Sequence, residues 1–374
     1  MRILIVNSNF PGRLGALARY LAVSGHEVLF AAAHGRRESA LEGVQRAVLK
    51  IRARVRAAEG CGFLTLWKRA ILAGEQALAP LRLLAVEFRP DMVLYPHAEG
   101  LTFFIRQALP LAFHVFYLTG AEAQAGANLY QLRVLESDCC VAFSRAERRI
   151  LPAELQNHVR LAAPWVEAEL LDPALAQPFL PETLPPGAEL LSADMRGLDE
   201  AQEGAVYRLV AEVLALRPRC HAVLDYGESG GLRARCLPEG LRSRLHTAEF
   251  LPLAARRDML CASSLHLCPN EAGLFPGRLE AMSCAALIMS PVLQEDAAVL
   301  RPGENMLPLP QDSRKRLAAV LQALDHAREF TPLRARARET VLAAFTPQAV
   351  LPGHAAMLME AYAAKRAGKT VSRG

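Results

Sequence analysis

Short apolar runs alternate with longer amphipathic stretches along most of the chain. The first run covers Arg2–Val6, an amphipathic stretch follows over Leu14–Ser24, and a second run covers His26–Phe30. A short apolar run is typical of a buried strand, whereas apolar positions that recur with the helical period indicate a helix. The opening therefore predicts strand, helix, strand, which is the first unit of a doubly wound α/β domain. It lacks the G-x-G-x-x-G sequence of a dinucleotide-binding turn.

The same alternation begins again after a proline-rich segment near the middle of the chain. The prolines of this segment are Pro173, Pro178, Pro181, Pro185 and Pro186. Such a density of proline favours an extended linker. A chain of 374 residues is long enough for two domains of the usual size. We therefore expect two Rossmann-like doubly wound domains, covering 1–170 and 187–346, joined by a linker at about 171–186.

The segment between Leu265 and Ser290 has the composition of a ligand site. It predicts a strand, a loop rich in Gly and Pro, a helix and a second strand. Pro276 suits the first helical turn, and Glu280 follows in or just after that turn. Ligands of open α/β sheets bind outside the carboxyl ends of the strands, and free N–H groups at a helix start attract anions. We expect an anionic ligand here, although a Glu in this place also suits the helix dipole alone.

Composition narrows the class of protein. Hydrophobic residues make up 52% and charged residues 22% of the chain, as in soluble enzymes. No apolar run approaches the ~20 residues of a membrane span. The eight cysteines contain no C-x-x-C pair. This pattern argues against a zinc site or a disulfide framework and favours a reducing cytoplasm.

Basic residues are concentrated between Arg36 and Arg56. Arg52, Arg54 and Arg56 alternate with apolar residues, which predicts a strand with one charged face. Positive charge that guards a solvated sheet edge explains the pattern, and contact with anionic lipid or a phosphorylated acceptor is the alternative. Aromatic residues are not interleaved, so nucleic-acid binding is not expected. We expect a cytoplasmic protein with at most peripheral contact at the inner membrane face.

Five short motifs, in chain order, resemble those of the family 4 glycosyltransferases. They are NFPG at 9–12, RPD at 89–91 followed by His97, RGLD at 196–199, LEAM at 279–282 and PGEN at 302–305. The first of them is similar to the opening loop of a bacterial subgroup of this family. The resemblance implies the GT-B architecture, in which two Rossmann-like domains face each other across a cleft. It also implies that a terminal helix, at about 347–368, packs back on the first domain.

The resemblance further implies a function, the transfer of a sugar from a nucleotide-diphosphate sugar to an acceptor. The acceptor would be a glycan, a lipid-linked molecule or a protein in bacterial glycan or glycoconjugate synthesis. The family reaction retains the anomeric configuration and needs no metal and no other cofactor. Breaking the bond between sugar and phosphate leaves negative charge on the diphosphate, which the site must stabilise.

The resemblance assigns roles to individual residues. Arg196 would hold the donor diphosphate together with the backbone at 276–277, Glu271 would approach the sugar, and His97 would lie near the acceptor; these three side chains are the candidate catalytic residues. His97 is alternatively a hydrogen-bonded loop histidine, and Gly12 a plain turn glycine. Glu280 would hold the nucleotide ribose. The donor-binding set comprises Gly12, Arg196, Gly197, Gly227, Pro276, Gly277, Leu279 and Glu280.

The chain also departs from the family pattern at four places, two of which are Ala285, where the family has Gly, and the altered segment APWVE at 163–167. Ala272 stands where the family has a carboxylate eight positions before Glu280, and none of residues 200–204 is basic where the family has a second cation. These departures favour an alternative function, a glycosyltransferase-like binding protein or partner subunit without turnover. A sugar-nucleotide epimerase or hydrolase on the same architecture is a third hypothesis.

Overall fold

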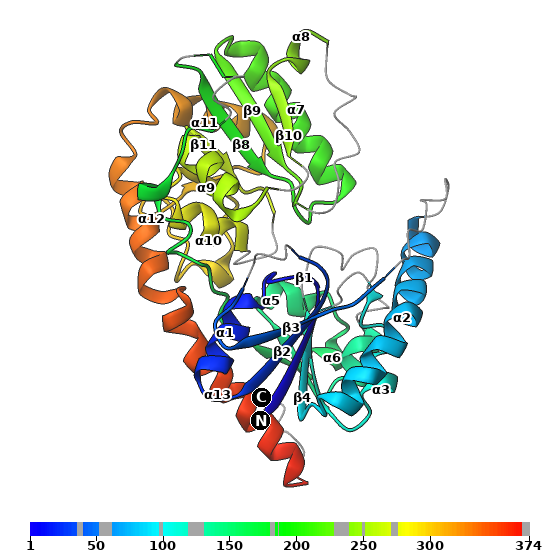
Figure 1. Ribbon diagram of the computed structural model, residues 1–374. Helices are drawn as coiled ribbons and strands as arrows, with labels where there is room; N and C mark the ends of the chain where they lie inside the picture. Colours follow the sequence, from blue (N-terminus) through cyan, green and yellow to red (C-terminus); the bar gives the residue numbers. More distant parts are fainter. Residues whose placement is uncertain are drawn as a thin grey trace. The chain divides into compact units, whose positions relative to one another are not determined.

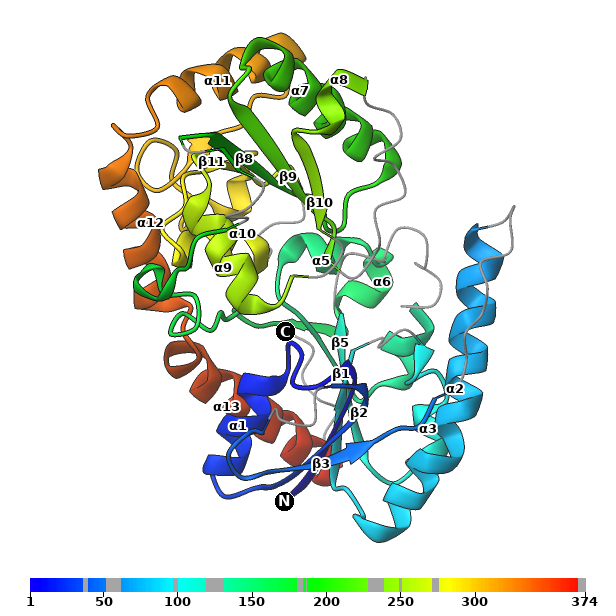
Figure 2. The same ribbon diagram turned by 45° about the horizontal axis from the view of Figure 1, so that its top comes forward.

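The computed structural model describes residues 1–35, 40–51, 62–96, 100–118, 131–179, 184–185, 187–227, 239–248, 251–270 and 276–368. The chain divides into two compact units. Unit 1 is formed by Met1–Ala163 and Leu351–Gly374, and unit 2 by Pro164–Val350. Each unit is a parallel sheet with helices on its faces (Figures 1 and 2). The chain therefore passes between the units twice.

The described part of unit 1 contains a parallel sheet of seven strands in the order β3-β2-β1-β4-β5-β6-β7. The strands are β1 (Arg2–Asn9), β2 (Glu27–His34), β3 (Val44–Val48), β4 (Met92–Tyr95), β5 (Phe113–Leu118), β6 (Cys139–Ala142) and β7 (Val159–Leu161). The helices are α1 (Gly15–Val23), α2 (Gly62–Glu87), α3 (Ile105–Ala108), α5 (Arg145–Arg149), α6 (Ala153–Gln156) and most of α13 (Pro347–Arg366).

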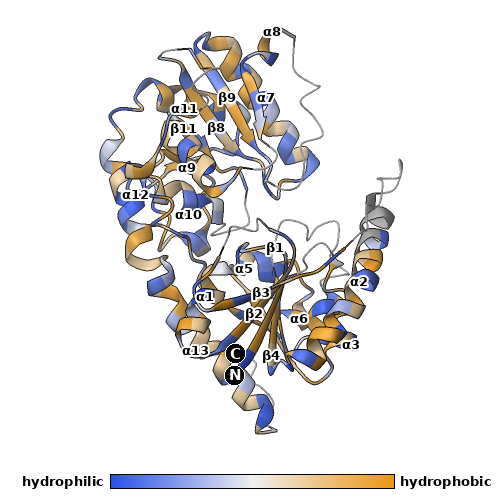
Figure 3. Cartoon of the chain, in the orientation of Figure 1, coloured by the Kyte–Doolittle hydropathy of each residue, from blue (hydrophilic) through white to orange (hydrophobic). Residues whose placement is uncertain are grey.

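The inner strands of unit 1 are largely apolar on both faces because helices cover both (Figure 3). Leu4 and Val6 of β1 lie in the core that α2 and α3 complete. On the other face, the hydroxyl of Tyr117 in β5 lies 2.8 Å from Nε2 of His354 in α13. Helix α13 therefore supplies part of the unit 1 core, although it begins in unit 2.

The described part of unit 2 contains a parallel sheet of six strands in the order β10-β9-β8-β11-β12-β13. Counted from β8, this is the Rossmann order 3-2-1-4-5-6. The strands are β8 (Glu189–Asp194), β9 (Cys220–Asp225), β10 (Leu245–Ala248), β11 (Leu265–Leu267), β12 (Ile288–Ser290) and β13 (Leu307–Pro308). The helices are α7 (Glu200–Leu216), α8 (Glu239–Arg242), α9 (Leu253–Ala262), α10 (Pro276–Ser283), α11 (Ser313–Asp325) and α12 (Thr331–Ala344).

Two helix layers enclose the unit 2 sheet. Helices α7 and α11 share one apolar core with the sheet, and α9, α10 and α12 share the other. Val166, Ala168 and Leu171 also lie in the second core. The predicted first domain ran to residue 170, whereas this packing places 164–171 in unit 2.

The predicted fold class, two Rossmann-like doubly wound sheets, is confirmed. The helix expected over Leu14–Ser24 is α1. The strand expected over Arg52–Arg56 falls outside the described residues. Among those residues, one stretch, Thr331–Arg366, is long and apolar enough to span a membrane by length and composition. It consists of α12 and α13, whose apolar side chains include the buried Val341 and Leu358.

Candidate functional site

Charged side chains gather at the carboxyl ends of the strands of unit 2. Asp194 ends β8 and Asp225 ends β9, and the order of the strands reverses between β8 and β11. Open α/β sheets bind ligands at such a switch point. We call the group formed by Asp194, Arg196, Asp225, Arg256 and Glu280 the charged cluster.

Arg196 is the most firmly held member of the charged cluster. Its Nε lies 2.8 Å from Oδ1 of Asp194, and its Nη2 lies 2.7 Å from Oδ2 of the same carboxylate. The Arg196 Nη2 also donates to Oε2 of Glu280 at 3.2 Å. The bidentate pair fixes the plane of the guanidinium group. The structure thus brings together Arg196 and Glu280, both of which the sequence predicts as site residues.

Arg256 is a second cation at this site, which the sequence analysis missed. It lies on α9, where its Nε donates to Oδ2 of Asp225 at 3.0 Å and its Nη1 lies 3.5 Å from Oε2 of Glu280. One oxygen atom of Glu280 therefore faces two guanidinium groups. Arg256 lies outside the motifs of the sequence. It is on α9, whereas the resemblance places the second cation in segment 200–204, at the start of α7.

Ion pairs lower the pKa values of Asp194 and Glu280 although both carboxyl groups are buried. Burial alone would raise the pKa of Asp194, but the adjacent Arg196 brings it below its ordinary value. Burial likewise acts to raise the pKa of Glu280, and Arg196 and Arg256 together lower it. Both carboxylates are therefore charged at neutral pH. His266 on β11 interacts electrostatically with both carboxylates, and burial lowers its pKa to about 4, so it is neutral at neutral pH.

Three glycines of the predicted donor-binding set lie where the backbone conformation or the lack of space disfavours a side chain. Gly197 and Gly227 have φ values of +71° and +61°, which side-chain-bearing residues rarely adopt. A Cβ at Gly227 would lie 2.9 Å from Cδ of Arg196. A Cβ at Gly277 would overlap both Oδ2 of Asp194 and Nη2 of Arg196. Gly277 therefore makes room for the pair of Asp194 and Arg196, and Gly227 for the Arg196 side chain.

Helix α10 begins at Pro276, as the sequence predicts. The first N–H groups of a helix have no partner within it, so that of Gly277 is available as a donor. The Leu279 side chain is fully buried in the core. Leu279 therefore presents no side chain to a ligand.

Buried polar contacts hold the loop ends around the site. Asn270, after β11, donates from Nδ2 to the carbonyl oxygen of Arg196 at 3.0 Å. Arg278 is 1% exposed and donates to the carbonyl oxygen of Asn270. Asp296 lies 3.7 Å from the Arg278 guanidinium. Arg278 is thus a positioning residue and is not presented to a ligand.

The acids of the segment 200–204 belong to the start of α7. Asp199 caps this helix by accepting from the Gln202 backbone N–H at 2.8 Å, and the Gln202 side chain accepts from the Asp199 N–H at 3.0 Å. Glu200 and Glu203 lie in the first turn, where negative charge favours the helix dipole. The segment in which the family has its second cation therefore forms a capped helix start in this chain.

The remaining predicted residues lie elsewhere. Gly12 is in unit 1, in the turn between β1 and α1, with φ +50° and its Cβ position against Asn7 and the Asn9 carbonyl oxygen. His97 and Glu271 lie outside the described residues. Within the residues that the structure describes, no group of three or more His, Cys, Asp or Glu side chains could hold a metal ion.

Solved structures of other proteins share the fold of this chain. A scan against protein-family models finds no match, and neither does a search of curated protein sequences. Sucrose-phosphate synthase from Thermosynechococcus elongatus superposes with a TM-score of 0.72 at 15% identity, covering 97% of this chain and 100% of that one. Anabaena Alr3699/HepE in complex with UDP-glucose gives 0.65 at 13% identity, covering 96% and 99%.

A third similar structure is WaaG, a glycosyltransferase involved in lipopolysaccharide biosynthesis. Its TM-score is 0.62 at 14% identity, with 96% of this chain and 99% of that chain covered. At such identities the likeness establishes the fold. The chain therefore has the two-domain Rossmann-like fold of the GT-B glycosyltransferases.

Proposed function

We propose that the protein is a glycosyltransferase that takes a sugar from a nucleotide-diphosphate sugar. The observation that carries the proposal is the pair Arg196 and Arg256, whose guanidinium groups meet Glu280 at the switch point of the unit 2 sheet. The fold supports it, since one protein with this fold was solved with UDP-glucose bound. The five motifs that resemble family 4 lead us to propose that the protein belongs to that family.

Arg256 supplies the donor that a diphosphate needs beside Arg196. Its contacts with Asp225 and Glu280 use Nε and Nη1, and its Nη2 makes no hydrogen bond with any described residue. A phosphate oxygen would accept from this nitrogen and from the Gly277 backbone N–H. Arg256 thus takes the place of the second basic residue that segment 200–204 lacks.

Glu280 is arranged to bind a hydroxyl group without releasing its arginines. Both guanidinium contacts use Oε2, and Oε1 has no hydrogen-bond partner among the described residues. A ribose hydroxyl would donate to Oε1 while Oε2 keeps its two ion pairs. This geometry supports the ribose role that the resemblance implies for Glu280.

The proposed reaction breaks the bond between the anomeric carbon and the diphosphate oxygen. Arg196 and Arg256 are preorganised for the negative charge that develops on the leaving group, so they cost little reorganisation in the transition state. We propose that the reaction retains the anomeric configuration and is metal-independent, as in family 4. The acceptor would be a bacterial glycan or glycoconjugate, and the protein would be cytoplasmic, with the basic region 36–56 touching anionic lipid at most peripherally.

A binding protein without turnover is the second candidate. It is favoured by the charge of the cluster, in which three carboxylates, Asp194, Asp225 and Glu280, face the two guanidinium groups. A nucleotide diphosphate would add further negative charge. Transfer or hydrolysis of the donor by purified protein separates the two functions, since a binding protein shows neither.

A thermal-shift screen against UDP-, GDP- and ADP-sugars tests the proposal. A ligand at a hundred times its dissociation constant adds ~2.7 kcal/mol to the free energy of unfolding. The hit is then assayed for transfer with Arg256→Ala and, as a matched control, Arg314→Ala, which removes an exposed charge from α11. If Arg256→Ala and Arg314→Ala weaken binding of the donor equally, the assigned site is refuted.

A further inference from the structure

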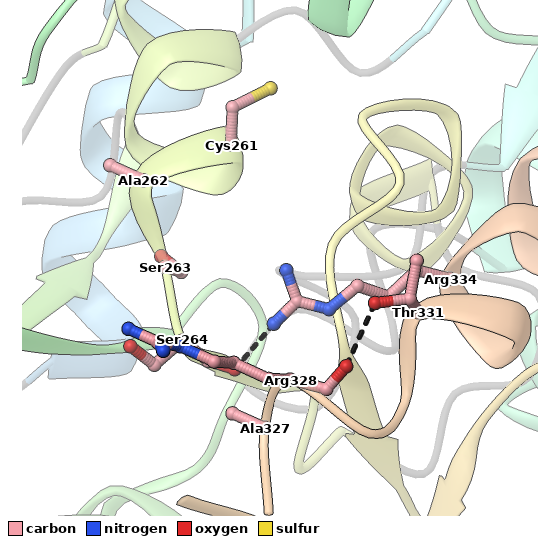
Figure 4. Close-up of a pocket in the computed structure, with 8 residues that line it drawn as sticks. All are labelled: Cys261, Ala262, Ser263, Ser264, Ala327, Arg328, Thr331 and Arg334. Atoms are coloured by element: carbon pink, nitrogen blue, oxygen red, sulfur yellow. Dashed lines mark hydrogen bonds between the residues drawn. The ribbon is translucent and has the colours of Figure 1, made fainter.

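A pocket in unit 2 lies at the opposite end of β11 from the charged cluster. It has a volume of about 290 Å³ and is lined by residues of two segments, 261–264 and 327–334 (Figure 4). The first segment ends α9 and leads into β11, and the second leads into α12. Its size suits a small ligand, since sites for drug-sized molecules begin at roughly 300 Å³.

The lining of this pocket carries positive charge and no carboxylate. Arg328 and Arg334 line it together with Thr331, Ser263 and Ser264. In Figure 4 both arginine side chains extend from the 327–334 segment toward the 261–264 segment. The residues that line the pocket therefore include two cations with no compensating acid.

Arg334 is only partly satisfied by the protein. Its Nη2 donates to the carbonyl oxygen of Ser264 at 2.9 Å, whereas its Nε is buried without a hydrogen-bond partner. Neither Arg334 nor Arg328 forms an ion pair with any described residue. Burial without a counter-charge lowers the pKa of Arg334. A guanidinium group in this state gains from a bound anion.

The acids nearest in sequence are engaged elsewhere. Asp325 lies 2.6 Å from Nη1 of Arg217. Glu329 lies 2.8 Å from Nδ1 of His326. Neither of these acids lines the pocket. The helix dipole places partial positive charge at the start of α12, beside the pocket. The residue before this helix, Phe330, provides no side-chain cap.

We propose that this pocket binds a phosphate group, either as free phosphate or as the phosphate of a small monoester. Arg328 and Arg334 are the charged ligands, and the Ser264 hydroxyl and the start of α12 complete the polar wall. The site is separate from the charged cluster, because it lies at the amino end of β11 and the cluster at the carboxyl ends of the strands. The inference does not depend on the proposed transferase activity.

Calorimetry on the full chain with inorganic phosphate and with glucose 6-phosphate tests this proposal. Arg328→Ala and Arg334→Gln are each expected to weaken the bound probe about tenfold or more, because each removes a charge-assisted contact. Arg196→Ala and Arg314→Ala are expected to leave the affinity unchanged. Tighter binding of glucose 6-phosphate than of phosphate identifies a monoester site, and equal binding a phosphate site.

Two results would overturn the proposal. The first is no binding of either probe at millimolar concentration. The second is binding that Arg196→Ala removes and Arg328→Ala spares, since the probe would then occupy the charged cluster. Arg328 is exposed and its side chain forms no hydrogen bond or ion pair with the described residues, so its variant remains informative if Arg334→Gln unfolds.

Discussion

A single methyl group at position 277 tests the geometry of the charged cluster. In Gly277→Ala the new Cβ would overlap Oδ2 of Asp194 and Nη2 of Arg196. These atoms form a buried ion pair, with side-chain exposures of 4% and 17%. The pair cannot yield without losing hydrogen bonds, so either α10 shifts or the guanidinium group rotates.

Two opposing terms decide the sign of the stability change. Alanine gains at most ~1 kcal/mol over glycine in a helix, and overpacking of a well-packed site costs ~1–3 kcal/mol. We expect a net loss of about 1–2 kcal/mol, which lowers Tm by about 2–8 °C for a domain of this size. If the ion pair separates altogether, the loss rises to ~3–5 kcal/mol.

Gly204→Ala provides the matched control. Gly204 lies inside α7, and its Cβ position meets only Nη1 of Arg208, at an ordinary 3.6 Å. This variant should be more stable than the parent by ~0.5–1 kcal/mol. Urea unfolding of both variants, with calorimetry of UDP binding, measures the effect. A Gly277→Ala protein that is as stable as Gly204→Ala and binds UDP like the parent would refute the reasoning.

Further predictions concern the charged cluster and His354. Arg196→Ala should weaken binding of a nucleoside diphosphate by about ten- to a hundredfold and spare the bare nucleoside, because it removes a charge-assisted contact of ~1.5–3 kcal/mol to phosphate; calorimetry with both ligands that shows equal losses would contradict this. Glu280→Ala should weaken both ligands, since its carboxylate would contact ribose, and unchanged nucleoside affinity would exclude that role. Arg256→Ala should lower kcat/KM for donor turnover more than Arg314→Ala does, and equal rates in a transfer assay would remove Arg256 from the site. Burial lowers the pKa of His354 from 6.5 to about 4, so the unfolded chain binds more protons between these values and stability falls as pH drops from 6.5 to 4, by up to ~3 kcal/mol for this group. His354→Gln should flatten that part of the curve of unfolding free energy against pH, and an unchanged slope would show that the residue does not titrate in this way.

The fold could be predicted because both sheets are buried on two faces. Strands such as Arg2–Asn9 therefore have sequences that are largely apolar, and glycine and proline residues after them indicate the turns into the following helices. Pro276 at the start of α10 and Gly197 at a positive φ follow from local backbone preferences. Such features depend on neighbouring residues in the sequence, so one chain is enough to find them.

The partners within the site could not be predicted in the same way. Asp194 lies two residues before Arg196, yet nothing in that spacing shows that it clamps the guanidinium group. Arg256 reaches Glu280 from α9, 24 residues away, through the packing of two helices on one sheet face. The roles of His97 and Glu271 stay predictions, as do the donor contacts of the described site residues.

The division of α13 between the units has a consequence for the order of folding during synthesis. Leu351, His354 and Leu358 are buried core residues of unit 1, but all of unit 2 is made before them. The ribosome takes roughly 10–40 s to make residues 164–350 at ~5–20 residues per second. Unit 2, which is continuous in the chain, can therefore complete its core first. The first 163 residues must wait with an open apolar face, and chaperone dependence should concentrate in the N-terminal half of the nascent chain.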